Sequence, residues 1–197
     1  MFAALLSAPA VATPPVYATP EEKAFVDALM AKMTVEEKLG QLNQPPGVGN
    51  NTGPAAMAGN EDQIRRGEIG SYLGTQGAAL TCRLQKIAVE ESRLGIPLLF
   101  GYDVIHGHRT VFPVPLAESS SFDPEEVQHA ARVAAVEAAA HGIHWTYAPM
   151  VDIARDPRWG RIVEGAGEDP YLGSVLAAAR VRGFQGEDLR KPDAVLA

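Results

Sequence analysis

The chain has 197 residues, of which 46% are hydrophobic, and its 17 basic and 24 acidic side chains give a formal net charge of −7. This size and apolar content suffice for one globular domain with a sizeable core, and the acidic balance without a basic stripe argues against a nucleic-acid partner. The single cysteine, Cys82, excludes an intramolecular disulfide and a cysteine-rich zinc site.

Residues 1–20 differ in composition from the rest of the chain. A short apolar run at 1–6 is followed by Ala-Val-Ala at 10–12, which has the form of a signal-peptidase site, and then by a proline-rich stretch. We interpret residues 1–20 as a signal peptide shortened at its front and a linker, because the usual basic start is missing; a plain apolar tail is the alternative. A signal would direct the protein to the periplasm or out of the cell, and no stretch has the ~20 apolar residues that membrane insertion requires.

Two helices are expected next. The segment at 21–33 has a helical spacing of apolar residues, and a second helix is expected to begin after Thr34. Thr34 and Glu37 form a capping box, in which the threonine hydroxyl accepts the Glu37 amide and the glutamate reaches back to the Thr34 amide. Residues 44–59 are rich in glycine, proline and asparagine, which predicts a loop.

Short apolar segments then alternate with helical patterns. The clearest helix start is Asp123 followed by Pro124, since aspartate is a good N-cap and proline suits the first helical position. Cys82 falls in a predicted helix, where we expect a small buried or half-buried residue. Strands are expected at 69–73, 97–102, 143–148 and 194–197, and helices at 78–92, 124–141 and 171–185.

This alternation predicts an α/β fold with a parallel sheet. The strands are almost continuously apolar, as in sheets that are buried on both faces. A barrel is favoured over an open doubly wound sheet, because no glycine-rich phosphate loop follows the first strand and polar clusters follow the second and third strands instead. We therefore predict the N-terminal part of a (β/α)8 TIM-type barrel with about three to four βα units, since a full barrel needs ~250 residues.

The first polar cluster, at 101–108, follows the second predicted strand. Asp103 would place a carboxylate in the barrel mouth, where it can accept hydrogen bonds from two adjacent sugar hydroxyls; a role as a turn cap is the alternative. His106 and His108 form an H-x-H pair that would share one face of a strand and could bind a metal. Against this, Gly107 indicates a loop, and no further cluster of ligands is evident.

The second polar cluster, at 148–170, holds three arginines, one tryptophan and five acids. An ion-paired loop over a barrel mouth fits this composition, because guanidinium groups suit hydroxyl and carboxylate partners; a purely structural salt-bridge network is the alternative. Paired carboxylates are the basis of glycoside hydrolysis, but their separation in space does not follow from their spacing in the sequence. The residues alone therefore predict a polyol-binding barrel mouth.

Three segments together resemble glycoside hydrolase family 3, and most of all its bacterial periplasmic β-glucosidase branch. They are MTVEEKLGQL at 33–42, GYDVIHGHRTVFPVPLAESSSFD at 101–123 and WTYAPMVDIARDPRWGRIVEGAGEDPYL at 145–172. The string DPRWGR followed by GEDP is highly specific, and the likeness runs from about residue 21 to the C-terminus. On this resemblance, residues 21–197 are expected to form part of the family's N-terminal barrel domain.

The resemblance implies a retaining, exo-acting β-glucosidase that hydrolyses terminal β-D-glucosyl or related β-glycosidic bonds in carbohydrate catabolism, with no metal or organic cofactor. It implies that Asp103 binds sugar hydroxyls and that Arg161, the second arginine of DPRWGR, contacts the same sugar. It places the family's Lys-His pair, nucleophilic aspartate and acid/base in later segments, which form the other barrel half and an α/β sandwich domain. No catalytic residue is therefore assigned in this chain, and we expect it to be inactive alone.

Two other interpretations remain open. One is a non-catalytic glycan-binding or scaffold protein, and the other, less favoured, is a metal-dependent barrel hydrolase that uses His106 and His108. A partial barrel is also expected to be unstable and prone to association, because its edge strands at 69–73 and 194–197 would lack partners.

Overall fold

The computed structural model describes residues 19–47 and 61–197 of the chain. Residues 1–18, which hold most of the expected signal peptide and linker, lie outside the described residues, as do residues 48–59 of the expected loop. Within the described part of the chain, no helix is both long and apolar enough to cross a membrane.

Helices α1 (Pro20–Lys32) and α2 (Val35–Gln41) open the described part of the chain. The Glu37 amide donates to Thr34 Oγ1 at 3.2 Å and the Thr34 amide donates to Glu37 Oε2 at 2.9 Å, so the predicted capping box is confirmed. The Glu37 carboxylate also accepts two N–H groups of Arg93, at 2.9 and 2.5 Å. This ion pair ties α2 to the segment that leads into the second strand.

The sheet has three parallel strands, in the order β1 (Ser71–Leu73), β2 (Leu99–Tyr102) and β3 (Trp145–Thr146). Each strand pairs with the next one along the chain, with Tyr72 opposite Phe100 and Gly101 opposite Trp145. The predicted parallel sheet is confirmed. Each strand is shorter than its apolar run, because ladder pairing extends only over the residues that overlap with the neighbouring strand.

Both edges of this sheet carry a further pairing. Leu196, in the expected fourth strand, forms a parallel bridge with Trp145. On the other side, the segment 43–47 runs along β1, where Pro46 forms a parallel bridge with Leu73. The expectation that this edge lacks a partner is therefore wrong, because residues that were expected to form only a loop fill it.

The predicted helices are present between the strands: α4 (Ala78–Lys86), α6 (Pro124–Ala140) and α7 (Pro170–Gln185). A π-helical turn at Ile87–Glu91 continues α4, so the helix expected at 78–92 is present with a change of pitch. Asp123 caps α6 as predicted, and its Oδ1 accepts the amides of Glu125 and Glu126. Cys82 lies in α4 as expected but is exposed, so the expected burial is wrong.

Two short helices were not predicted: α3 (Glu61–Arg65) and α5 (Pro115–Ser119). A five-residue helix makes little more than one turn, so it gives the sequence no apolar period to recognise. A 3-10 turn at Ile162–Glu164 escaped for the same reason.

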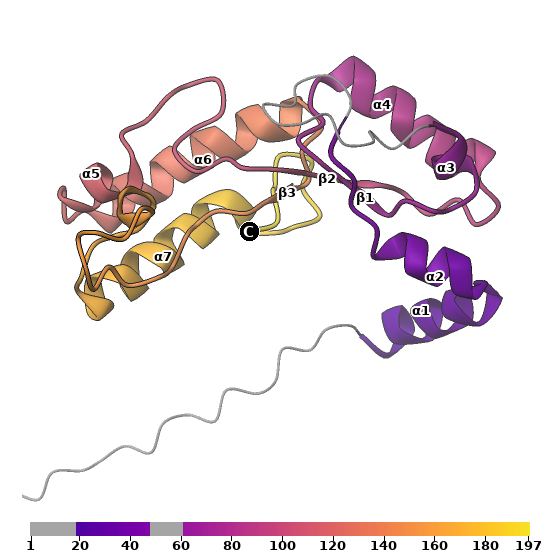
Figure 1. Cartoon of the computed structure of the whole chain (residues 1–197), viewed down its shortest axis with the longest axis horizontal. Coiled ribbons are helices and arrows are strands. Elements are labelled where there is room, and N and C mark those ends of the chain that lie inside the picture. The colour runs from indigo at the N-terminus through magenta and orange to yellow at the C-terminus, as the bar shows by residue number, and fades with distance from the viewer. Residues whose placement is uncertain (1–18, 48–60) are drawn as a thin grey trace, which may run out of the picture.

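Neighbouring side chains in the middle of the sheet differ in exposure. Tyr72 and Phe100 are fully buried with their rings stacked at 6.2 Å, whereas their neighbours Leu73 and Leu99 remain 43% and 46% exposed. This difference follows from the alternation of side chains along a strand. In Figure 1, α6 and α7 lie beyond β3, α3 and α4 lie on the β1 side, and α1 and α2 stand apart from α6 and α7.

Small residues bring α6 and α7 close together. A Cβ on Gly183 would lie 2.6 Å from the Ala131 Cβ, so a larger side chain does not fit there. Close packing of this kind makes the position of one helix depend on the other. The core beside these two helices is completed by buried side chains from the strands and loops: Val104, Ile143, Ala148 and Val195.

Candidate functional site

Asp103 is the first residue after β2, at the carboxyl end of the sheet, and it is exposed. No hydrogen bond or ion pair from the described residues engages its carboxylate, whose charge acts on Arg161 and Tyr147. An ionised carboxylate accepts several hydrogen bonds. Asp103 is therefore available to a ligand that carries hydroxyl groups.

The loop that carries Asp103, residues 103–114, is held by a distant helix. Glu137 on α6 accepts the amides of Arg109 and Thr110, at 2.8 and 2.7 Å, and the Thr110 hydroxyl at 2.7 Å. These hydrogen bonds, above all the one from the Thr110 hydroxyl, lower the pKa of Glu137. The carboxylate thus stays ionised and fixes the loop against α6.

His106 and His108 contact different partners. The Nδ1 atom of His106 lies 3.0 Å from the Phe112 carbonyl oxygen, and the Nε2 atom of His108 lies 2.8 Å from Nδ1 of His141. Burial, with a smaller contribution from His141, lowers the pKa of His108. In the two described ranges, no group of three or more His, Cys, Asp or Glu side chains is arranged to hold a metal. These contacts do not favour the metal interpretation.

Arg161 lies on the exposed loop after β3. Its Nε and Nη2 atoms donate to the Glu164 carboxylate at 2.8 and 2.6 Å, and this pair raises the pKa of Arg161. The negative charges of Asp152 and Asp103 add smaller contributions in the same direction. The fold thus brings Asp103 and Arg161, which lie on different loops, into the same electrostatic neighbourhood.

Tyr147 also borders this neighbourhood, although the sequence did not single it out. Its ring lies 4.8 Å from that of Trp145, and a Cβ on Gly101 would collide with its hydroxyl. Burial, and to a lesser degree the charge of Asp103, raises the pKa of Tyr147. One signal could have found it, because alternation places Trp145 and Tyr147 on the same face of a strand.

Gln44 lies close to the Tyr147 hydroxyl, whose pKa it acts to lower. Its Nε2 atom is buried and has no hydrogen-bond partner among the described residues. Gln44 is thus the described neighbour of the Tyr147 hydroxyl, and it lies in the segment that runs along β1.

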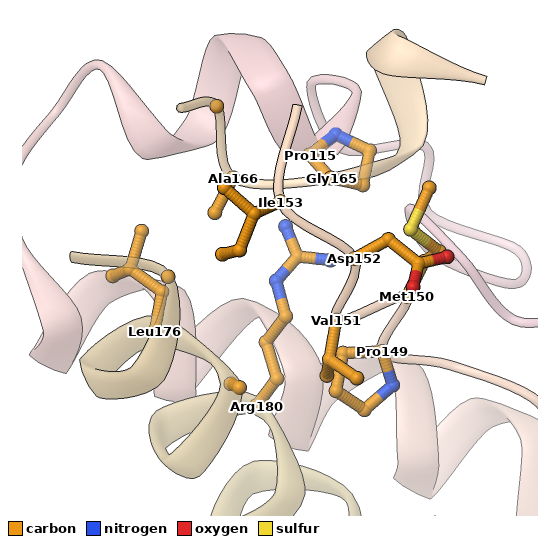
Figure 2. Close-up of a pocket in the computed structure, with 13 residues that line it drawn as sticks. Pro115, Pro149, Met150, Val151, Asp152, Ile153, Gly165, Ala166, Leu176 and Arg180 are labelled. Atoms are coloured by element: carbon orange, nitrogen blue, oxygen red, sulfur yellow. The ribbon is translucent and has the colours of Figure 1, made fainter. Parts of the chain in front are cut away.

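Figure 2 shows a cavity beneath the loop after β3, lined by Val151, Ile153, Leu176 and Arg180 among others. Its volume of about 20 Å³ suffices for one water and excludes a sugar. A wider groove, of about 780 Å³, lies between α6, α7 and the segment before Leu196, and charges of both signs line it. Neither hollow is lined by Asp103. The candidate site is therefore an open surface at the carboxyl end of the strands, outside both hollows.

The sequence of the chain matches a family of known proteins. Residues 34–195 match the profile described as "Glycosyl hydrolase family 3 N terminal domain". The chain is 45% identical over 170 residues to the periplasmic beta-glucosidase of Salmonella typhimurium, a match that covers 86% of this chain and 22% of that protein. It is 36% identical over 187 residues to the lysosomal beta glucosidase of Dictyostelium discoideum, covering 82% and 23%.

Solved structures agree with these matches. The beta-glucosidase from Listeria innocua in complex with isofagomine superposes with a TM-score of 0.77 at 42% identity, covering 90% of this chain and 25% of that chain. A mutant of the exo-1,3/1,4-beta-glucanase ExoP from a Pseudoalteromonas species superposes with a TM-score of 0.77 at 30% identity, covering 90% and 31%.

The chain thus spans about a quarter of the length of these relatives. The predicted fold class is confirmed: the parallel sheet and its helices form the N-terminal part of a TIM-type barrel. The family match extends over most of the chain and includes both loops of the candidate site. By this match and by its identity to the named relatives, the chain belongs to glycosyl hydrolase family 3.

Proposed function

We propose that this chain is the sugar-binding N-terminal part of a retaining, exo-acting β-glucosidase, which hydrolyses terminal β-D-glucosyl or related β-glycosidic bonds. One observation carries the proposal: the carboxylate of Asp103, which no other described residue engages, lies at the carboxyl end of the sheet, in the electrostatic neighbourhood of Arg161. Active sites of barrel enzymes form at this end of the strands. The names of the Salmonella, Dictyostelium and Listeria relatives support the substrate class.

The arrangement suits a sugar ring. Asp103 would accept hydrogen bonds from adjacent hydroxyls, and Arg161 would donate from the N–H groups of Nη1 and Nη2 that Glu164 does not accept. Hydrogen bonds to charged groups are the stronger ones, and those that tighten as positive charge develops on the sugar accelerate the reaction. The exposed ring of Tyr147 would border the apolar face of the same sugar.

The two reacting carboxyl groups of a retaining glycosidase stand about 5–5.5 Å apart. We assign neither role to a residue of this chain: the nucleophile and the acid/base would come from the remaining barrel half and from an α/β sandwich domain. That the relatives are about four times longer supports this division. Residues 21–197 would then be part of the barrel domain, and residues 1–20 a signal peptide and linker. The periplasmic relative supports a periplasmic or secreted location.

The test is substitution in the full-length enzyme that contains this chain. Asp103→Ala is expected to lower kcat/KM on an aryl β-glucoside by an amount equivalent to about 2–4 kcal/mol, because charge-assisted hydrogen bonds to the sugar are lost. Arg161→Lys should also be harmful, since an ammonium group cannot replace the planar fork of a guanidinium. Asp27→Ala, on the exposed surface of α1, is the matched control. A near-wild-type kcat/KM for Asp103→Ala would exclude Asp103 from the site.

The 197-residue chain alone is expected to show no hydrolysis of the same substrate. Nucleophilic and acid–base groups each contribute orders of magnitude to the rate, and the proposal places both elsewhere. Turnover by the purified chain above a mock preparation would contradict this division of the site.

A further inference from the structure

Arg180 is a buried cation in the packed face of α7. Its side chain is 9% exposed, and the other buried residues of this helix are uncharged. One amino group, Nη2, donates to the carboxylate of Glu118 on α5, whose side chain is 15% exposed. The other, Nη1, donates to the carbonyl oxygen of Ile105 at 3.2 Å. One side chain therefore joins α7, α5 and the loop after β2.

Stability alone does not account for this pair. Burial is the largest influence on both groups, since it lowers the pKa of Arg180 and raises that of Glu118. Removing two charges from water offsets most of their attraction, so an apolar pair of similar volume is often as stable or more stable. The buried neighbours Leu176 and Ala179 show that apolar residues fit this face of α7. What an apolar pair lacks is a directed hydrogen bond to the Ile105 carbonyl.

The guanidinium of Arg180 lies beneath both loops of the candidate site. Ile105 follows Asp103 by two residues, so its carbonyl belongs to the backbone that presents that carboxylate. Figure 2 shows the same side chain rising from α7 toward Val151 and Ile153, which lie on the loop that leads to Arg161. Arg180 is thus placed to control the distance between the two loops.

We propose that Arg180, oriented by Glu118, is a positioning residue that sets Asp103 relative to the loop of Arg161. The inference rests on the proposed function, which gives Asp103 and Arg161 a common ligand. Productive sites hold their groups to within about 0.5 Å, and a misplacement of ~1 Å can reduce the rate ~100-fold. Lysine could keep the ion pair with Glu118, but a single ammonium group does not reproduce the two-armed geometry of the guanidinium.

The experiment compares the wild-type full-length enzyme that contains this chain with variants of it. Arg180→Met combined with Glu118→Leu removes both charges at similar volume, and Arg180→Lys keeps the charge alone. Arg182→Met changes an exposed arginine of the same helix and is the control. Each protein is assayed for thermal stability, for kcat and KM, and for hydrogen exchange of the amides at 104–112.

The double variant is expected to keep the wild-type Tm, while the amides at 104–112 exchange about tenfold faster and kcat/KM falls by about tenfold or more. Arg180→Lys should show the same fast exchange at this segment, and Arg182→Met should match wild type. Wild-type exchange and kcat/KM in the double variant would overturn the inference. So would full rescue by Arg180→Lys, or faster exchange spread evenly over the whole domain with a lower Tm.

The exchange measurement needs no sugar, so it separates the two proposals. If the wild-type enzyme hydrolyses no β-glycoside but the double variant loosens only 104–112, the positioning role stands and the proposed function fails. If the wild-type enzyme is active but exchange at 104–112 is unchanged, the proposed function stands and the positioning role fails.

Discussion

The loops after β2 and β3 hold their polar residues in place by different means. In the loop at 103–114, the anchor is Glu137, which reaches in from α6 and accepts hydrogen bonds from the loop backbone. In the loop at 150–167, Arg161 pairs with Glu164, only three residues away. The polar anchor of the first loop thus comes from a distant helix, whereas Arg161 finds its partner within its own loop, although that loop also packs on α6 and α7 through Ala166.

This difference implies that the two halves of the candidate site respond to different changes. Substitution of Glu137, whose hydrogen bonds reach only the first loop, should displace Asp103 and leave the ion pair of Arg161 intact. A substitution in the DPRWGR string should do the reverse. The predictions that follow test this independence by hydrogen exchange in the full-length enzyme, because exchange reports local opening of separate segments.

The largest effect is expected when the buried side chain of Arg180 loses its ion-pair partner Glu118. Glu118→Leu alone leaves the Arg180 cation buried without an anion and should lower the free energy of opening of α7 by about 3–5 kcal/mol. Exchange of the α7 amides measures this. Glu90→Leu, which removes an exposed acid that faces Lys86, is the control and should leave α7 unchanged. Equal effects from both variants would show that Arg180 needs no partner.

An intermediate and local effect is expected at Glu137. Glu137→Ala removes the acceptor of three hydrogen bonds, so the amides of Arg109 and Thr110 should exchange about tenfold faster or more. Residues 150–167 should keep their wild-type exchange. A matching acceleration there would contradict the independence of the two loops.

The difference in exchange between the wild type and Glu137→Ala is also expected to depend on pH, in a direction set by the pKa of Glu137. The pKa of folded Glu137 lies below its ordinary value of 4.5, so its stabilisation is present above that value and is lost as the pH falls through the folded pKa. The ratio of variant to wild-type exchange at Thr110 should therefore be largest near about pH 6 and approach one in acid well below that value. A ratio that grows on acidification would refute the assignment.

The smallest effect is expected in the loop after β3. Asp156→Asn weakens the ion pair with Arg158, whose side chain is 89% exposed, and exposed pairs contribute little because water screens them. Neither the Tm nor the exchange of 103–114 should change measurably. If this variant loosened the loop that carries Asp103, the two loops would form one unit.

The sequence predicted most of the fold because its signals are local. The Asp123 cap and the capping box of Thr34 and Glu37 each lie within four consecutive residues, and the strands and long helices are periodic. The one-turn helices α3 and α5 escaped because a single turn has no period. The pairing of the segment 43–47 with β1 was not predicted, because a bridge between residues far apart in the sequence produces no periodic pattern of residue types.

The same distinction applies to the candidate site. Asp103 and Arg161 were found because charged residues after apolar strands are conspicuous, and the structure then placed them in one neighbourhood. Tyr147 was missed because an aromatic residue in an apolar strand has the same appearance as a core residue. The anchors Glu137 and Arg180 were missed because their partners are brought to them only by the packing of the helices.

The order of the strands has a consequence for how this chain is made. Each strand pairs with the one before it, and Leu196 adds to β3 in the same sense. Every new unit that leaves the ribosome therefore finds its partner already synthesised, and the sheet can grow vectorially during translation, one strand at a time. The segment 43–47 shields the edge where growth begins. The edge that each new strand leaves open is then the one that the following strand covers, which shortens its exposure to other chains.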